Sequence, residues 1–143
     1  MALRFDMAPF DELHIGKCVL KNSHGRALFI IEGDTPVLKA KDFLSTEKAA
    51  KTLEKLYCCI QGMYLEEAHQ EYQGSYAAFM ARSLSEHLDL ASDLQSVDQW
   101  VISRDYYKAL KLLKKWIGSA AFIVDQKPSA NYVPRYSGWK KAL

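Results

Sequence analysis

The sequence predicts an α+β protein: a small N-terminal antiparallel β-sheet or partial barrel followed by a bundle of about four α-helices. Two observations predict this fold. Up to residue 45, short runs of apolar residues alternate with polar ones, which is the period of half-buried strands. After residue 45, apolar residues recur at intervals of three and four, the period of amphipathic helices. The 143 residues, 49% of them hydrophobic, suffice for one globular unit with a real core.

The first 45 residues form the predicted N-terminal β module. Its four expected strands are residues 3–7, 13–20, 26–31 and 35–39. The intervening segments 9–12, 22–26 and 32–34 contain the turn formers Pro, Gly, Asn and Asp. Short strands separated by such turns favour a small antiparallel sheet.

Residues 46–124 form the predicted helical bundle, folded as one unit with the β module. Its first helix should follow an N-cap at Ser45 or Thr46. That helix carries the apolar stripe Ala49, Leu53, Leu56, Ile60 and Met63. A second helix is expected from Leu65 towards Leu88. The third carries Leu90, Leu94, Val97 and Val101, and the fourth covers residues 104–122.

Two adjacent tyrosines in the fourth predicted helix point in different directions. At about 100° per residue, Tyr106 shares an apolar stripe with Leu110 and Leu113, which places it in the core. Tyr107 falls on a basic face instead. That face consists of Arg104, Tyr107, Lys108, Lys111, Lys114 and Lys115.

Positive charge gathers at the C-terminal end of the chain. Residues 1–45 hold six Lys or Arg against six Asp or Glu, and residues 46–103 hold four against nine. Residues 104–143 hold nine against two, although the whole chain has a net charge of only +2. Residues 125–143 lack periodicity and are predicted to form a flexible basic and aromatic tail. This uneven distribution of charge is informative about binding partners rather than about the fold.

No motif typical of catalysis or cofactor binding is present. The sequence lacks GxSxG, P-loop and GxGxxG patterns, and its cysteines lack zinc-ligand spacing. His69 and His87 are 18 residues apart, about 27 Å along a helix, so they cannot share a metal ion. We therefore expect a protein that is not an enzyme and that uses no metal or other cofactor.

Three features predict a cytoplasmic protein without a membrane segment. The N-terminus has no signal-peptide pattern, and no apolar run is long enough to cross a bilayer. Cys18, Cys58 and Cys59 are odd in number and are expected to be reduced packing residues.

The basic face around Tyr107 suits single-stranded nucleic acid, because lysines can follow phosphates while an aromatic ring stacks on a base. The tail has a similar composition, with Tyr132, Tyr136 and Trp139 among basic residues. The same chemistry also suits an acidic protein partner. Composition and spacing alone do not choose between the two.

Several short patterns follow one another along residues 2–117. They are Leu3, Pro9 and Glu12, Asn22 and Arg26, Val37-Leu38, Lys41-Asp42, Leu44, Tyr57, Met63-Tyr64-Leu65 and RDYYKALKLLKKWI at Arg104 to Ile117. In this order and spacing the chain resembles the FlbT family, small flagellar regulators of alphaproteobacteria. It departs from the family pattern at Phe10, where a glycine is usual, and at Lys39, where arginine is usual. Lysine loses the planar bidentate hydrogen bonding that arginine offers to phosphate.

The resemblance implies a non-enzymatic post-transcriptional regulator. Such a protein would bind the 5′ untranslated region of flagellin mRNA and lower its translation and stability, while some family members act as activators. The resemblance also implies coupling to the flagellar protein FlaF and to flagellin. No family catalytic residue exists to carry over.

The sequence leaves two candidate RNA-binding surfaces as alternatives, and it also leaves a different class of function. Besides the basic helix face, the β module offers Arg4, Arg26, Lys39 and Lys41. The alternative function is a protein–protein adaptor or chaperone-like module that docks flagellin or a FlaF-type partner. A homo-oligomer is compatible with the sequence.

Deleting the residues after Asp125 should leave the thermal unfolding midpoint nearly unchanged, because this segment has no apolar periodicity with which to join the core. Differential scanning calorimetry of the full and shortened chains measures this. A large drop would mean instead that Tyr132 or Trp139 packs into the fold.

Overall fold

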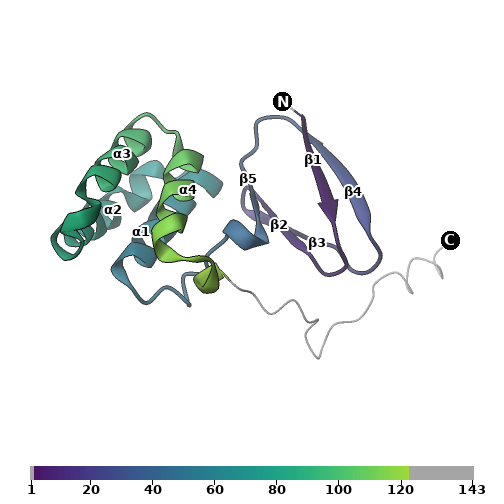
Figure 1. Cartoon of the computed structure of the whole chain (residues 1–143). Coiled ribbons are helices and arrows are strands. Elements are labelled where there is room, and N and C mark those ends of the chain that lie inside the picture. The colour runs from purple at the N-terminus through teal and green to yellow at the C-terminus, as the bar shows by residue number, and fades with distance from the viewer. Residues whose placement is uncertain (1, 123–143) are drawn as a thin grey trace.

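The computed structural model describes residues 2–122 and confirms the α+β class (Figure 1). The strands are β1 (Ala2–Met7), β2 (Glu12–Ile15), β3 (Cys18–Lys21), β4 (Ala27–Glu32) and β5 (Val37–Lys39). The helices are α1 (Thr52–Leu65), α2 (His69–Glu86), α3 (Ala91–Ile102) and α4 (Tyr106–Ile117). Short 3₁₀ turns are η1 (Ala40–Asp42), η2 (Leu88–Leu90) and η3 (Ser119–Phe122). The predicted tail, residues 125–143, lies outside the described residues.

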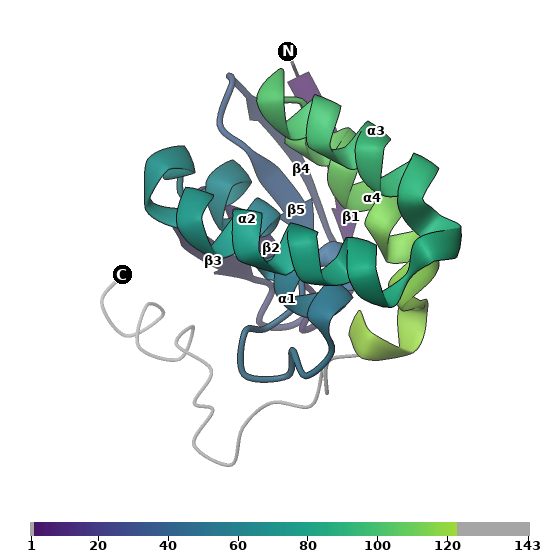
Figure 2. The ribbon, with the colours of Figure 1, turned by 90° about the vertical axis from the view of Figure 1, so that its left-hand side faces the viewer.

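The strands form two antiparallel sheets that pack face to face. One sheet pairs β1 with β4, so that Phe5 faces Phe29, and the other has the order β3-β2-β5. The inner faces meet around Met7, Leu13 and Val37. In Figure 1 the three-stranded sheet lies between the helices and the β1–β4 layer, and Figure 2 shows the helices in front of the strands. The molecule therefore has three layers, with β1–β4 outermost.

The middle sheet is covered on both sides, so its residues do not alternate cleanly between core and solvent. Leu13 faces the β1–β4 layer, while the adjacent His14 stacks on Phe43 with ring centroids 3.6 Å apart. Both side chains are buried. Burial lowers the pKa of His14, so burial favours its neutral form.

The predicted single strand 13–20 is wrong, because the chain folds back within it. Ile15 pairs with Cys18, so Gly16 and Lys17 form a two-residue hairpin turn. Gly16 has a φ of 55°. A positive φ at the first turn position suits glycine, which has no Cβ to clash there. Residues 2–122 therefore contain five strands instead of four.

Three predicted helix boundaries are also wrong. The first helix begins at Thr52 rather than after Ser45 or Thr46, because residues 45–49 form turns of their own. The second begins at His69 rather than Leu65, after Glu67 adopts a φ of 54° and breaks the helical path. The fourth covers Tyr106–Ile117, because Arg104 and Gly118 both have positive φ values.

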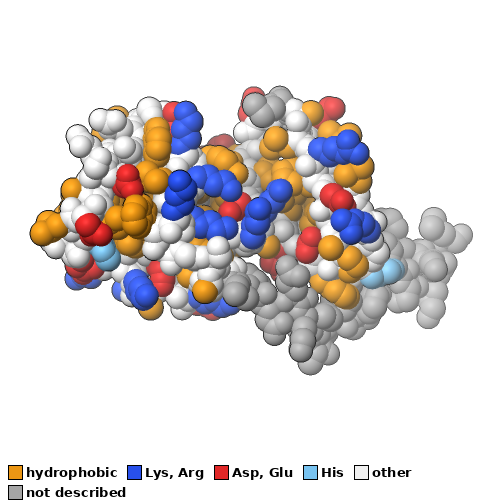
Figure 3. Space-filling view, in the orientation of Figure 1, with side chains coloured by type: hydrophobic (Ala, Val, Ile, Leu, Met, Phe, Trp, Pro, Cys, Tyr) orange, Lys and Arg blue, Asp and Glu red, His pale blue; other side chains and the backbone are white. Residues whose placement is uncertain are grey.

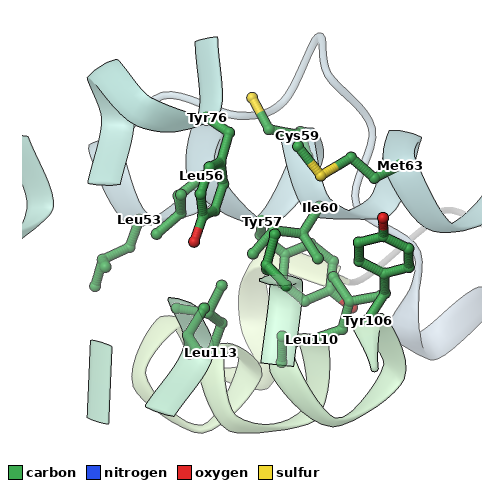
Figure 4. Close-up of a cluster of buried hydrophobic side chains, with 14 of the residues drawn as sticks. Leu53, Leu56, Tyr57, Cys59, Ile60, Met63, Tyr76, Tyr106, Leu110 and Leu113 are labelled. Atoms are coloured by element: carbon green, nitrogen blue, oxygen red, sulfur yellow. The ribbon is translucent and has the colours of Figure 1, made fainter. Parts of the chain in front are cut away.

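The main core lies between α1 and the other helices. Figure 4 shows Leu56, Tyr57 and Ile60 on one side and Leu110 and Leu113 on the other. The predicted stripe of the third helix is buried at all four positions: Leu90, Leu94, Val97 and Val101. The predicted division of the tyrosines is confirmed, since Tyr106 is buried and Tyr107 is 45% exposed.

Leu113→Ala should lower the free energy of unfolding by about 2–5 kcal/mol, because it leaves a cavity at a fully enclosed site. Lys108→Ala is the matched control on the same helix. The Lys108 side chain is exposed and makes no hydrogen bond or ion pair with residues 2–122, so its loss should cost less than about 0.5 kcal/mol. Urea unfolding of both variants measures the difference, and equal losses would contradict the helix phase.

Candidate functional site

The predicted basic face of α4 divides into two groups of side chains. Arg104 lies in the turn before α4 rather than on the helix, and it is exposed, as are Lys108 and Lys115 on α4. None of these three makes an ion pair or a side-chain hydrogen bond within the described part of the chain. Lys111 and Lys114 instead reach across to Asp42 in η1. The first group is free for a ligand, whereas the second has a structural role.

Asp42 is the centre of this contact. Its carboxylate is buried and accepts a hydrogen bond from Nζ of Lys114 at 2.8 Å. Nζ of Lys114 also donates to the carbonyl oxygen of Lys41 at 2.6 Å, and Nζ of Lys111 lies 3.4 Å from Asp42 Oδ2. The two lysines thus hold the end of the β module against α4.

The pKa of Asp42 reflects this environment. Burial raises the pKa of a carboxyl group, but the hydrogen bond from Lys114 and the charges of Lys111 and Lys114 outweigh that effect. The pKa of Asp42 therefore lies below its usual 3.8. Asp42 is a stable anion at neutral pH.

One face of α1 holds the same connection from the other side. Tyr57 donates a hydrogen bond to the carbonyl oxygen of Asp42. Gln61 donates to the carbonyl of Leu44 at 2.8 Å and accepts from its N–H at 2.9 Å. The hydroxyl of Tyr64 donates to the carbonyl of Val37 at 3.2 Å. The strand-to-helix connection is therefore fixed at three points one helical turn apart.

Tyr107 lies beside this connection. Its ring centroid is 6.4 Å from that of Tyr64, and Nζ of Lys111 lies 5.2 Å from the Tyr107 ring centroid. A lysine ammonium at this distance is attracted by the ring face. Contacts on these two sides restrict the Tyr107 ring while it stays partly open to solvent.

The four candidate residues of the β module do not form one group. Arg4 lies on the outer side of β1, and Arg26 makes a two-pronged ion pair with Asp6, with both N–O distances 3.0 Å. Lys39, at the end of β5, lies with Nζ 5.9 Å from the Phe5 ring centroid. Lys41 is exposed in η1, where its carbonyl contacts Lys114.

Of the four, Lys41 therefore lies where η1 meets α4, whereas Lys39 reaches Phe5 of β1 and Arg4 and Arg26 belong to the outer sheet. Figure 3 shows Lys and Arg side chains gathered over α4 and towards the strands. We call the exposed part of this region the basic band. Leaving out Lys111, which is bound to Asp42, it consists of Lys41, Arg104, Tyr107, Lys108 and Lys115.

Sequence reasoning missed Asp42 and Tyr64 as parts of this region. Both contact residues far away in the chain, and neither stands out by periodicity. The position of Asp42, an acidic residue between the last strand and the first helix, was a weak indication of its role. Nothing in the sequence indicated the role of Tyr64 beyond its place in the family pattern.

Other kinds of site find little support in residues 2–122. No group of three or more His, Cys, Asp or Glu side chains there could hold a metal ion. Cys58 and Cys59 are free and buried, and burial raises the pKa of the Cys58 thiol to about 12. None of the described helices combines the length and apolar character needed to span a bilayer.

Comparison with known proteins decides the family. The model of the family described as flagellar protein FlbT matches residues 3–121. The chain belongs to the FlbT family. The resemblance found from the residues alone is therefore confirmed.

Several FlbT relatives cover most of this chain. A probable flagellum biosynthesis repressor protein FlbT of Rhodopseudomonas palustris strain TIE-1 is 33% identical over 117 residues, which is 82% of this chain and 93% of the relative. A second, from Caulobacter sp. strain K31, is 28% identical over 123 residues, covering 82% and 92%. The flagellum biosynthesis repressor protein FlbT of Caulobacter vibrioides strain ATCC 19089 is 26% identical over 123 residues, covering 82% and 85%. No solved structure matches the chain.

Asp42→Asn should lower the free energy of unfolding at pH 7 by about 1–3 kcal/mol, because it removes the charged acceptor of two lysines. The folded pKa lies below the unfolded value, so the ionised carboxylate stabilises the fold above about pH 4. This stabilisation is lost as the pH falls through the folded pKa. Urea unfolding should be measured at pH 7 and at a pH well below 3.8. The difference in unfolding free energy between variant and wild type should be smaller at the lower pH.

Asp34→Asn is the control, because Asp34 is exposed and has no ion pair with the described residues. It should change the free energy of unfolding by less than about 0.5 kcal/mol. An Asp42→Asn effect that is equally small would show that the two lysines do not depend on this carboxylate.

Proposed function

We propose that this FlbT family member represses flagellin expression by binding the 5′ untranslated region of flagellin mRNA through the basic band. It acts as a cytoplasmic regulator without catalysis. The names of the relatives support the repressor role, since they are described as flagellum biosynthesis repressors. The continuity of exposed positive charge around one partly open tyrosine supports RNA as the ligand.

The observation that carries this proposal is the contact between Lys114 and the Lys41 carbonyl. It brings the basic end of the β module against the basic face of α4. Of the β-module residues that the sequence offered as a rival surface, Lys41 therefore adjoins the basic face of α4. A single-stranded RNA lying along α4 would meet Lys108 and Lys115 and then reach Lys41 without leaving positive potential.

The side chains of the basic band suit a single strand. Its lysines are point charges on flexible stems, which can follow irregularly spaced phosphates. Tyr107 offers a ring that the neighbouring Tyr64 and Lys111 restrict, so that little rotational freedom is lost when a base stacks on it. Arg4 and Arg26 lie in the outer layer, and Arg26 is already paired with Asp6.

Replacing Lys41, Lys108 and Lys115 with glutamine should weaken binding of the leader RNA and make its salt dependence shallower. Each lost phosphate contact should reduce the slope of log K against log salt by about 0.7. Tyr107→Ala should weaken binding by about 1–3 kcal/mol with little change in that slope. Fluorescence anisotropy of labelled leader RNA across a potassium chloride series measures both quantities.

The matched control replaces Arg4, Lys17 and Arg26 with glutamine, which removes the same formal charge from the β module. We expect nearly unchanged RNA affinity for this variant. If it weakens binding and the α4 variant does not, the RNA surface is the outer sheet and the basic band is ruled out. Circular dichroism melting confirms that both triple variants are folded.

A groove between α2 and α3 favours the second candidate function, a docking module for flagellin or a FlaF-type protein. His69, Tyr76, Asp98 and Ile102 are among its lining residues. Tyr76 donates a hydrogen bond to Asp98 at 2.7 Å, and Ile102 is largely exposed. A groove lined by both apolar and polar side chains, with one carboxylate, suits a helix that carries a basic residue. Binding there should depend little on salt, whereas RNA binding should depend on it strongly.

A further inference from the structure

Within residues 2–122, the outermost layer is a sheet of two strands. β1 and β4 pair with each other, and within residues 2–122 neither has a second strand on its other side. An isolated two-stranded sheet is marginally stable in water. Its inner face packs on the middle sheet through Phe5, Met7, Phe29 and Ile31, but its outer face and its edges stay open.

The outward-facing side chains at the centre of β4 are apolar, whereas those at the facing positions of β1 are charged. The outward side chains Leu28 and Ile30 of β4 are 54% and 66% exposed. At the facing positions β1 has Asp6 and Arg4. Charged side chains on an edge strand discourage pairing with another chain. β1 carries this protection, and the centre of β4 does not.

We propose that β4 pairs antiparallel with β4 of a second copy, forming a two-fold homodimer with a continuous four-stranded sheet in the order β1-β4-β4-β1. This pairing would satisfy the open backbone groups of β4. It would also bring the exposed Leu28 and Ile30 of the two copies together on one face. The interface goes beyond the proposed RNA binding and does not depend on it.

The sequence of β4 selects one register for this pairing. In a continuous sheet, residues directly opposite each other point to the same face, so even positions must face even positions. Centring the two-fold axis on Phe29 puts Leu28 opposite Ile30 of the partner subunit. It also puts Arg26 opposite Glu32 of the partner subunit. Moving the axis by one residue to Ile30 would instead put Leu28 opposite Glu32 of the partner subunit.

The charges at the ends of β4 fit this register. Arg26 binds Asp6 through Nε and one terminal nitrogen, which leaves its other terminal nitrogen available. Glu32 is exposed and has no ion pair within the described residues. In the dimer, each Arg26 would lie between Asp6 of its own chain and the partner's Glu32. The same pairing would occur twice, once on each side of the axis.

Sedimentation equilibrium of the full chain tests the dimer. We expect a concentration-dependent monomer–dimer equilibrium for the wild type. Ile30→Lys should raise its Kd about tenfold, because a charged side chain would replace the apolar contact with the partner's Leu28 on both sides of the two-fold axis. Leu88→Lys is the control, since Leu88 is 79% exposed in η2, far from the sheet. Both positions are exposed, so thermal melting should be unchanged for both variants under conditions where the chain is monomeric.

Cysteine cross-linking tests the register. In a Cys18→Ser background, chains carrying Leu28→Cys and Ile30→Cys are co-expressed with tags of different size and oxidised. The proposed register predicts disulfides mainly between unlike chains. Two copies of position 28 would be diagonal neighbours about 7–8 Å apart, beyond the usual reach of a disulfide.

The outcomes are distinct. A wild type that stays monomeric over the whole concentration range overturns the dimer. A Leu88→Lys variant that weakens association as much as Ile30→Lys removes β4 from the interface. Predominant disulfides between like chains overturn the register. None of these results bears on RNA affinity, so failure here is distinguishable from failure of the proposed function.

Discussion

The buried carboxylate of Asp42 is the contact on which the arrangement of the two halves depends. Removing a carboxylate from water is costly unless charged donors replace the lost hydration. Lys114 and Lys111 supply those donors, and α1 holds the same backbone through Tyr57 and Gln61. The β module therefore has one defined position on the helices. Without that position, Lys41 would not meet the face of α4.

The position of this carboxylate also explains how the layers are ordered. η1 follows β5 directly, so fixing Asp42 against α4 draws β5 and the sheet it belongs to against the helices. Val37 is tied to Tyr64 at the same surface. The middle sheet is then covered on both faces, and β1–β4 is left as an outer layer with only one covered face. The open outer face of β1–β4 follows from how the module is attached.

Periodicity predicted those parts of the fold that depend on neighbouring residues. The spacing of Leu110 and Leu113 fixed the phase of α4 and separated Tyr106 from Tyr107, as the structure confirms. Periodicity did not predict where the chain turns. Gly16 turns the chain inside an apolar run, and Glu67 ends a helix in a segment that reads as continuous. Neither position interrupts the hydrophobic pattern, so pattern alone could not find them.

The candidate site shows the same limit in a sharper form. In sequence, Lys108, Lys111, Lys114 and Lys115 look alike, because all four lie on the polar side of one helix. The structure separates them through one residue 69 positions away from Lys111. A lysine bound to Asp42 has already exchanged its water for a carboxylate, and a phosphate would have to compete with that partner. The positive charge available to a ligand is therefore smaller than the number of lysines in this part of the sequence suggests. It lies on those lysines whose distance from Asp42 leaves them in solvent.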